Sequence, residues 1–404
     1  MKHTTLHQAV QSAAGLRLRL RLQPLYGQGE IIFPCTVAGG KYQTSKRRIP
    51  GFENSVECTI IDSVQSQANR MEDALLADIR AGNIFLPHIV TDFSGIGNDL
   101  EKAIGAITCF EAPHRIFDAI IRDSVNAEGK HFPFTKEGKA AIKANSKNAT
   151  AVYEISPASL LFGSWDSTGI SGGLGEKYTR CVVSELAAVN IEKETFRAGT
   201  REDPLNIAKE SFAASMKSEA GKNDDAWTAL AVKAAAKKKK LENASDINHS
   251  SVPWDGENKT TKEMHGGVTC DYIQQSTTIS FAALRQLHFL VDSKDLSSYG
   301  QTVLAAIALH AAALNVERGW HLRSRCDLIH DDGAKPEWVL LGASSSQEAL
   351  TTDITRQILN ESIEQANTAG LTWRDTPIQL TPSPALRELV INSQKAHRET
   401  APAE

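Results

Sequence analysis

Residues 16–22 read Leu-Arg-Leu-Arg-Leu-Arg-Leu, a strict alternation of apolar and basic side chains. Successive side chains of a strand point to opposite faces, so this pattern predicts a β-strand with a leucine face and an arginine face. The leucine face has to be covered by other elements, while the arginines stay on the surface. The chain is therefore expected to build a sheet with helices behind it and a basic front.

A second segment, Trp320 to Leu328, also alternates and is predicted to be a strand with a basic face. If the two strands are neighbours, one sheet face presents Arg19, Arg21, Arg323 and Arg325. A basic sheet backed by helices is typical of small RNA-recognition folds. The chain lacks their pair of stacking aromatic residues, which favours contacts with the RNA backbone over base reading. The alternative is that these arginines only keep exposed strands soluble.

The remaining periodicity predicts strands over 56–61 and 272–281 and a strand from Ser156 that leads into a glycine-rich loop. Helices are expected from Asp62 or Ser63 to Arg80, from Pro113 to about Ser124, and from Val303 to a cap at Arg318 and Gly319. Strands and helices intermix without a regular alternation. This favours an α+β fold with an antiparallel sheet.

The 404 residues predict two to three domains, or one large domain with insertions. Residues 197–264 are rich in Ala, Lys, Asn, Asp and Ser and poor in large apolar side chains, which predicts a mobile insertion. The chain then divides into a folded part (1–196 and 265–340), this insertion, and an acidic C-terminal segment (341–404).

Charge is unevenly distributed along the chain, although its net value is only −4. That net charge argues against a protein that coats nucleic acid through bulk charge. Residues 1–50 carry eight Lys and Arg against one Glu, whereas residues 331–404 carry six basic and eleven acidic residues. This uneven charge is consistent with a chain that binds an anion near its N-terminal end. An equal alternative is that the charges cluster by chance on surface loops.

The six cysteines form no CxxC pair, so they predict neither a zinc site nor a disulfide scaffold. No run of about 18 apolar residues predicts a transmembrane helix. The N-terminus lacks the apolar core of a signal peptide. These features together predict a cytoplasmic protein with reduced thiols.

The glycine-rich segment from Gly163 to Arg180 is a candidate polyanion site, because glycines let backbone N–H groups approach a phosphate closely. It has neither the ending of a Walker A loop nor dinucleotide-binding spacing, and a structural turn is the alternative. Its candidate contacts are Trp165, Ser167, Thr168, Gly172, Gly173, Gly175, Lys177 and Arg180.

Three other segments carry candidate contacts with nucleic acid. The predicted helix after Asp62 begins with amide and basic side chains that bond sugars, phosphates and bases, and a solvated helix face is the favoured alternative for this segment alone. Cations at the start of the helix expected from Pro113 are better explained by a bound anion than by local stability, with a local ion pair to Glu111 or Asp118 as the equal alternative. The third segment is the basic stretch 41–48. The candidates are Gln65, Gln67, Asn69, Arg70, His114, Arg115, Lys46, Arg47 and Arg48.

Five blocks, in this order, carry a resemblance to a known family: IIDSVQSQANRMEDAL (60–75), FEAPHRIFDAIIRDS (110–124), LLFGSWDSTGISGGLGEKYTR (160–180), HGGVTCDY (265–272) and ERGWHLRSRCDL (317–328). The chain resembles the backbone subunit of type I-G (formerly I-U) CRISPR Cascade complexes, in the Cas-seven branch of the RAMP superfamily. The resemblance implies an RRM-like (ferredoxin-like) palm with large insertions. It implies partners too: the CRISPR RNA, further copies of the chain, other Cascade subunits, and target DNA that pairs with the guide.

In such filaments a loop of each subunit reaches over its neighbour, and either 41–50 or 197–264 could be that loop. In the type I branch a separate helicase-nuclease cuts the DNA. The resemblance therefore implies no catalytic site, no cofactor and no metal. The alternatives are a metal-dependent RAMP-type endoribonuclease using an acid such as Asp166, and a phosphate-binding enzyme that uses the glycine loop.

Overall fold

The computed structural model describes residues 1–37, 41–94, 104–167, 175–196, 264–342, 346–348 and 350–400. Among the predicted contacts, Thr168, Gly172 and Gly173 lie outside these ranges. The predicted insertion 197–264 lies outside them too, except for Met264.

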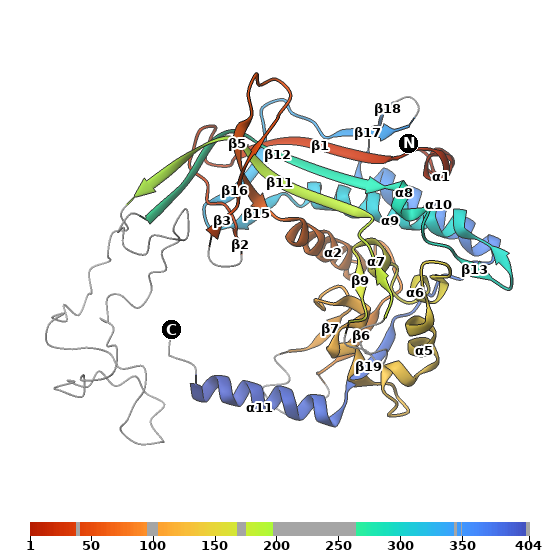
Figure 1. The fold of residues 1–404 in the computed structure, drawn as a ribbon. Coiled ribbons are helices and arrows are strands. Elements are labelled where there is room, and N and C mark those ends of the chain that lie inside the picture. The colour runs from red at the N-terminus through yellow and green to blue at the C-terminus, as the bar shows by residue number, and fades with distance from the viewer. Residues whose placement is uncertain are drawn as a thin grey trace, which may run out of the picture.

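A large sheet of antiparallel neighbours forms the upper layer of the molecule (Figure 1). Its strands are, in order, β15 (Trp320–Arg323), β16 (Cys326–His330), β1 (Gly15–Pro24), β12 (Met264–Ser280), β11 (Val182–Phe196), β5 (Val56–Asp62) and β4 (Thr44–Arg47). Two more strands, β17 (Glu337–Leu341) and β18 (Ser346–Glu348), extend the sheet beside the first half of β1.

The centre of the sheet has the ferredoxin-like βαββαβ order. Along the chain, β1 is followed by helix α2 (Val64–Arg80), the hairpin β11–β12, helix α9 (Ser297–Glu317) and β16. In space these strands lie in the order β16-β1-β12-β11. The α+β fold with an antiparallel sheet and inserted segments is therefore confirmed.

Among the described residues, helices cover one face of the sheet. The leucines of β1 are buried, and Leu16 and Leu18 share a core with α2, α9 and α1 (His3–Ser12). Further helices, α8 (Phe281–Leu284) and α10 (Thr352–Ala369), pack against α9. The opposite face carries the arginines of β1 and polar residues of β12, paired in register. We call it the front face, formed by Arg17, Arg19, Arg21, Gln274, Ser276 and Thr278.

A second lobe lies below the helices that cover the large sheet (Figure 1). Its sheet has the order β7 (Ala106–Thr108), β6 (Ile89–Asp92), β19 (Ile378–Pro382) and β8 (Ser124–Val125), so a C-terminal strand lies between strands from the first third of the chain. Short helices surround it: η1 (Arg115–Phe117), α4 (Ala119–Arg122), η2 (Phe132–Phe134), α5 (Lys136–Lys143), α6 (Thr150–Tyr153) and α7 (Pro157–Leu161). Helix α11 (Pro384–Thr400) follows β19.

Three strand pairs belong to neither of these two sheets: β2 (Thr36–Val37) with β3 (Lys41–Tyr42), β9 (Ser164–Trp165) with β10 (Lys177–Tyr178), and β13 (Leu290–Val291) with β14 (Lys294–Asp295).

Several predicted elements are confirmed. Strands lie where the alternation over 16–22, 56–61 and 272–281 places them. Ser63 is the N-cap of α2, because its side chain accepts a hydrogen bond from the Ser66 N–H at 3.3 Å. Helix α9 ends at the predicted cap, where Gly319 has a φ of +73°, although it begins six residues before Val303.

Three predictions are wrong. The helix expected from Pro113 is two single turns, because Asp118 is extended and caps a new turn by accepting from the Ile120 N–H. The strand expected from Ser156 is helix α7, which has Pro157 in its first turn. The strand expected over 320–328 is the hairpin β15–β16, which turns at Arg325 with a left-handed φ of +56°.

Within the described ranges, α9 is the one helix long and apolar enough to cross a membrane. It lies in the protein core, and 89% of its most apolar window is buried. Packing on the sheet, on α2 and on α10 accounts for its apolar composition.

Candidate nucleic-acid interface

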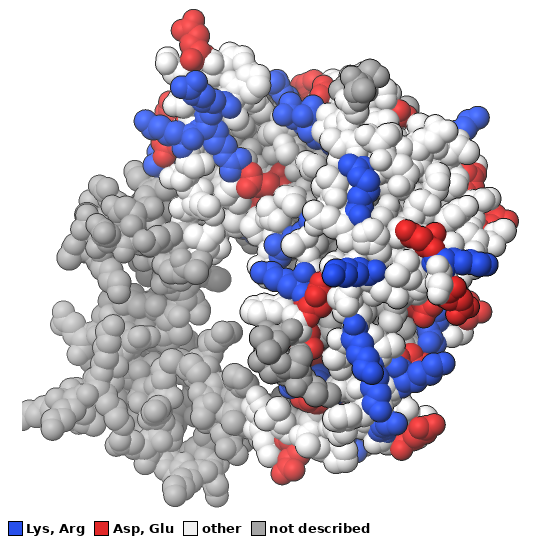
Figure 2. All heavy atoms as spheres, turned by 45° about the vertical axis from the view of Figure 1, so that its right-hand side comes forward, with Lys and Arg blue, Asp and Glu red and all other residues white. Residues whose placement is uncertain are grey.

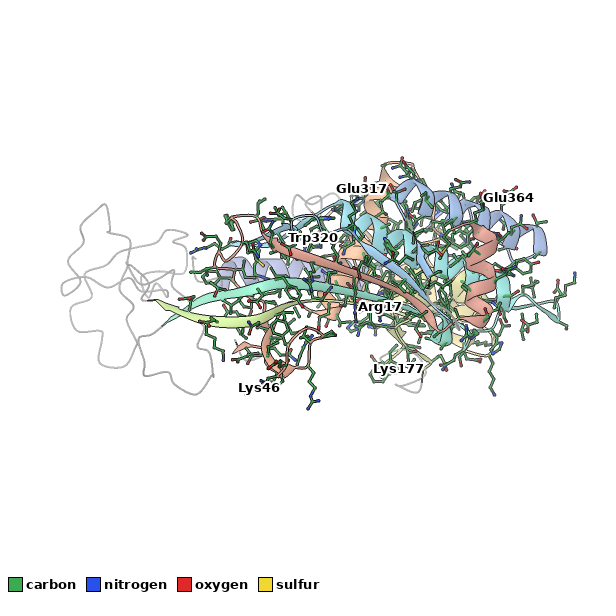
Figure 3. The ribbon with its side chains drawn as sticks, turned by 90° about the horizontal axis from the view of Figure 1, so that it is seen from above. Arg17, Lys46, Lys177, Glu317, Trp320 and Glu364 are labelled. Atoms are coloured by element: carbon green, nitrogen blue, oxygen red, sulfur yellow. The ribbon has the colours of Figure 1, made fainter. Side chains whose placement is uncertain are left out.

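The front face is the first group of predicted contacts that the fold brings together. Arg19 and Arg21 are exposed, and in the part of the chain that the structure describes neither has a carboxylate partner. The Arg21 guanidinium lies 4.2 Å from the ring centroid of buried Tyr272, which fixes its position over β12. Arg17 continues the row toward the start of β1 (Figure 3). Two unpaired guanidinium groups on a rigid strand can bind phosphate oxygens.

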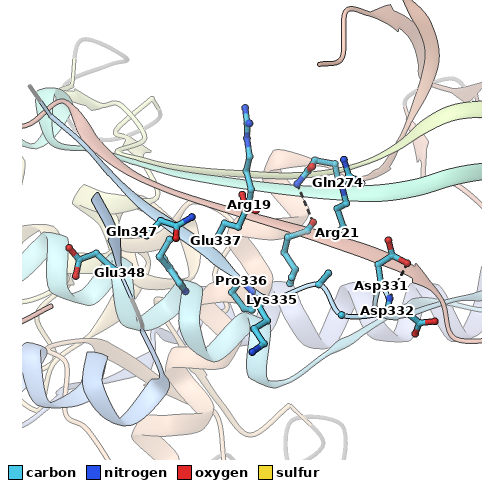
Figure 4. A pocket seen from close by; sticks show the side chains of 14 residues that line it. Arg19, Arg21, Gln274, Asp331, Asp332, Lys335, Pro336, Glu337, Gln347 and Glu348 are labelled. Atoms are coloured by element: carbon cyan, nitrogen blue, oxygen red, sulfur yellow. Dashed lines mark hydrogen bonds between the residues drawn. The ribbon is translucent and has the colours of Figure 1, made fainter. Parts of the chain in front are cut away.

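A cavity of about 780 Å³ opens at the edge of this face (Figure 4). It lies where β16 and β17 separate along β1, and Gln274 spans its floor by donating to the Leu20 carbonyl at 3.1 Å. Its charged lining is mixed and comprises Arg19, Arg21, Lys335, Asp331, Asp332, Glu337 and Glu348. This lining carries both signs, so it does not by itself select an anion.

The basic stretch at the other end of the sheet forms β4, an edge strand. Lys46 and Arg48 are exposed there. Arg47 instead pairs with Glu185 of β11 at 2.7 Å, so it holds β4 against its neighbours. Viewed from above, Lys46 and Lys177 lie along the same side of the molecule (Figure 3). Figure 2 shows one dense group of basic side chains at the upper left and a second series lower down, with acidic side chains interspersed.

The ends of the glycine-rich segment form the β9–β10 hairpin. Trp165 and Lys177 are cross-strand partners, and the Lys177 ammonium lies 5.5 Å from the centroid of the Trp165 ring. Trp165 is 48% exposed, while Lys177 and Arg180 are also on the surface. Gly175 is required at the base, because a Cβ there would stand 2.5 Å from the Asp166 carbonyl oxygen. The described part of the segment is thus a hairpin with an aromatic and two basic side chains on its surface, and Ser167 is half-buried beside them.

Arg115 is in the interior, which corrects the prediction of a cation at a helix N-terminus. Its Nε and Nη2 donate to the two carboxylate oxygens of Glu72 at 2.6 Å each, and its Nη1 donates to the Gly163 carbonyl at 2.8 Å. Glu111 and Asp118, the predicted local partners, bond elsewhere: Glu111 to Arg80, and Asp118 to the His114 N–H. His114 itself is exposed.

Gln67 is fully buried and has no surface to offer a ligand, contrary to the prediction. Its amide N–H donates to Asp62 at 2.6 Å, and its Oε1 accepts from Ser184 at 3.1 Å and from Asn315 at 3.2 Å. Trp320 extends the same buried network through Gln275. These bonds link α2 to α9 and to four strands, β5, β11, β12 and β15. Gln65 and Asn69, on the outer side of α2, are exposed.

Arg70 and Arg323 also serve this junction rather than the front face. Arg70 donates to Asp62 at 3.0 Å and to two backbone carbonyls of β15. Arg323 donates to the Ile61 carbonyl at 2.8 Å and to the Phe33 carbonyl at 3.0 Å. The predicted joint face of four arginines is therefore wrong, because β16 separates β15 from β1 and Arg323 turns inward. Arg325 is exposed in the hairpin turn, 5.5 Å from the Phe33 ring centroid.

The sequence reasoning missed three residues that shape these surfaces: Tyr272, Asp62 and Glu72. Tyr272 supports Arg21 from the neighbouring strand, and the two acids are buried anchors for arginines. Glu72 could have been found from the sequence, because it is an acid on the apolar face of α2, next to Met71 and four residues after Ala68. An acid in that position indicates a buried carboxylate that needs a partner.

Across the described ranges, no three His, Cys, Asp or Glu side chains gather in a way that could hold a metal ion. All six cysteines are free thiols. Burial raises the pKa of the Cys181 and Cys270 thiols to about 12 and that of Cys326 to about 11. Such thiols stay protonated near neutral pH and are poor nucleophiles.

Comparison with protein families gave one match, to a segment in the first half of the chain. Residues 16–193 match the family of CRISPR-associated protein GSU0053. This indicates a CRISPR-associated protein with a role in CRISPR defence. The match covers a little under half of the chain and includes all but the first residue of β1, all of α2, both strands of the β9–β10 hairpin and most of β11. The comparison with curated proteins gave no match.

Proposed function

We propose that this protein is a non-catalytic backbone subunit of a type I-G CRISPR Cascade complex. Several copies assemble along one CRISPR RNA in the cytoplasm, hold its phosphates and leave the spacer bases free to pair with target DNA. The observation that carries the proposal is the family match, since the matched segment contains the arginine strand of a one-sided ferredoxin-like sheet. RNA-recognition folds use this same architecture, with helices behind and RNA in front.

The exposed groups suit backbone contacts more than base reading. Arg19 and Arg21 on the front face and Lys177 and Arg180 at the hairpin all lack a carboxylate partner in the described structure, so they are available to phosphates. Sequence specificity then comes from pairing between guide and target, as in other RNA-guided systems.

The two ends of the large sheet support assembly of copies in one direction. The β4 edge exposes Lys46 and Arg48. Asp331 and Asp332 line the cavity where β16 and β17 separate, on the other side of β1 from β4. Unlike charges on opposite ends favour a head-to-tail contact, which repeats without closing and produces a filament. Other Cascade subunits are further partners of such a filament.

The decisive experiment is purification with and without a co-expressed CRISPR array, followed by measurement of mass and RNA content at 150 mM and 1 M salt. A large ribonucleoprotein containing RNA of one defined length supports the proposal. A nucleic-acid-free monomer in both cases, also when the other complex members are present, overturns it.

A charge-matched pair of variants separates the front face from bulk charge. Arg19→Ala/Arg21→Ala removes two cations from β1, and Lys139→Ala/Lys143→Ala removes two exposed cations from α5. We expect the first variant to assemble poorly on RNA and the second to behave as wild type. Equal losses in both would indicate non-specific attraction.

A further inference from the structure

Trp165 is one of eight exposed large hydrophobic side chains of the described residues, and the Lys177 ammonium lies 5.5 Å from its ring centroid. Its cross-strand partner is Lys177, and Arg180 follows at the base of the same hairpin. A protein-docking patch needs contiguous apolar surface. The exposed side chains named beside Trp165 on the described hairpin, Lys177 and Arg180, are cations.

The hairpin holds this indole rigidly. Arg115 bonds the Gly163 carbonyl directly before β9, and the Ser164 hydroxyl donates to the Ser159 carbonyl at 3.1 Å. On the partner strand, Tyr178 is buried next to Lys177. A fixed aromatic ring loses little conformational entropy when a second ring stacks on it.

We infer that Trp165 is a stacking platform for one unpaired nucleobase, with Lys177 beside it to bind an adjacent phosphate. This inference rests on the proposed function and names a contact within it that carries base-dependent affinity. Stacking on an aromatic side chain tolerates any base, because every base has a π face. The site therefore holds RNA without reading its sequence.

The test compares single-stranded RNA with an abasic ribose-phosphate chain of equal length, which keeps the phosphates and has no bases. The wild type is expected to bind the RNA more tightly than the abasic chain. Trp165→Ala removes that preference, with a loss of RNA affinity of about 5- to 150-fold per site and little change for the abasic chain. Trp165→Phe retains most of the preference.

Two further variants make the assignment specific. Phe134→Ala removes another exposed aromatic side chain, 49% exposed in η2, and is expected to keep the preference for RNA. Lys177→Ala is expected to weaken binding of both polymers by the same factor, because it removes a phosphate contact. Each variant is first checked for a wild-type unfolding curve.

Three results overturn the inference. The first is that Trp165→Ala keeps the preference for RNA over the abasic chain. The second is that Phe134→Ala loses as much of this preference as Trp165→Ala does. The third is that Trp165→Ala abolishes association between copies in the absence of RNA, which would make the indole a protein contact. The proposed function fails separately, if the wild type binds neither polymer and assembles on no RNA.

Discussion

Arg115 and Glu72 form a two-pronged ion pair in the interior, with both donor–acceptor distances at 2.6 Å. Arg115 adopts a left-handed backbone with a φ of +52°, a conformation that side chains other than glycine rarely adopt. The pair joins α2 to η1, and the third Arg115 bond, to the Gly163 carbonyl, reaches the segment directly before the β9–β10 hairpin. It thereby links the large sheet's helix to the surface that carries Trp165.

Removing only one member of this pair should destabilise the fold strongly. Arg115→Met leaves the Glu72 carboxylate buried without its partner, and we expect a loss of about 3–5 kcal/mol in the free energy of unfolding. The double variant Glu72→Met/Arg115→Met should recover much of that loss, because no charge is left buried. Urea unfolding of both variants measures this difference. A double variant that is less stable than Arg115→Met contradicts it.

The same carboxyl group predicts a pH dependence of stability. Burial raises the pKa of Glu72 to about 7, against the opposing effect of Arg115, whereas its ordinary value is 4.5. Between these values the folded state binds more protons than the unfolded state, so the Glu72 contribution to the free energy of unfolding falls as pH rises. It is fully present below about pH 4.5 and lost above about pH 7.

Glu72→Gln isolates this effect, because the amide does not titrate. We expect the stability of wild type relative to Glu72→Gln to fall by roughly 3 kcal/mol at most between about pH 5 and pH 8. Denaturant unfolding at a series of pH values gives the difference. A difference that rises with pH would show that the ion pair outweighs burial.

Gln67 should contribute to stability and not to RNA affinity. Gln67→Leu leaves Asp62, Ser184 and Asn315 without a shared partner, so we expect a loss of about 2–4 kcal/mol in the free energy of unfolding. The folded variant should bind RNA as the wild type does. Gln65→Leu, exposed on the same helix, is the control and should change stability by less than about 0.5 kcal/mol. A loss of RNA affinity in Gln67→Leu alone would return that residue to the interface.

Local patterns predicted the fold where one face of an element is buried. The alternation over 16–22 is decisive because a slip by one residue would bury arginines, and the cap at Ser63 depends on one nearby hydrogen bond. The chain over 320–328 alternates equally well. The turn within this segment could not be predicted, because it contains no Gly or Pro. The left-handed backbone position is instead occupied by Arg325, and arginine rarely adopts this conformation.

The fate of individual cations was harder to predict, because it depends on partners distant in the sequence. Arg115 and its acid are 43 residues apart, and Arg323 bonds carbonyls more than 260 residues away. A basic side chain on a predicted surface looks the same whether it faces solvent or a buried carboxylate. Arg21 and Lys177 are exposed, and the residues opposite them in register are Gln274 and Trp165. Arg19 has Glu337 opposite it on β17, but both side chains are exposed.

The salt dependence of RNA binding should count the phosphate contacts at the hairpin. Lys177→Ala and Arg180→Ala each remove one exposed cation, and each should reduce the slope of log affinity against log salt concentration by about one. The affinity falls for every RNA sequence alike, because phosphates carry no sequence information. Titrations between 50 mM and 300 mM salt measure the slope. Lys143→Ala, which removes an exposed cation from α5, should keep the wild-type slope, and an equal reduction there would mean that these cations act only through net charge.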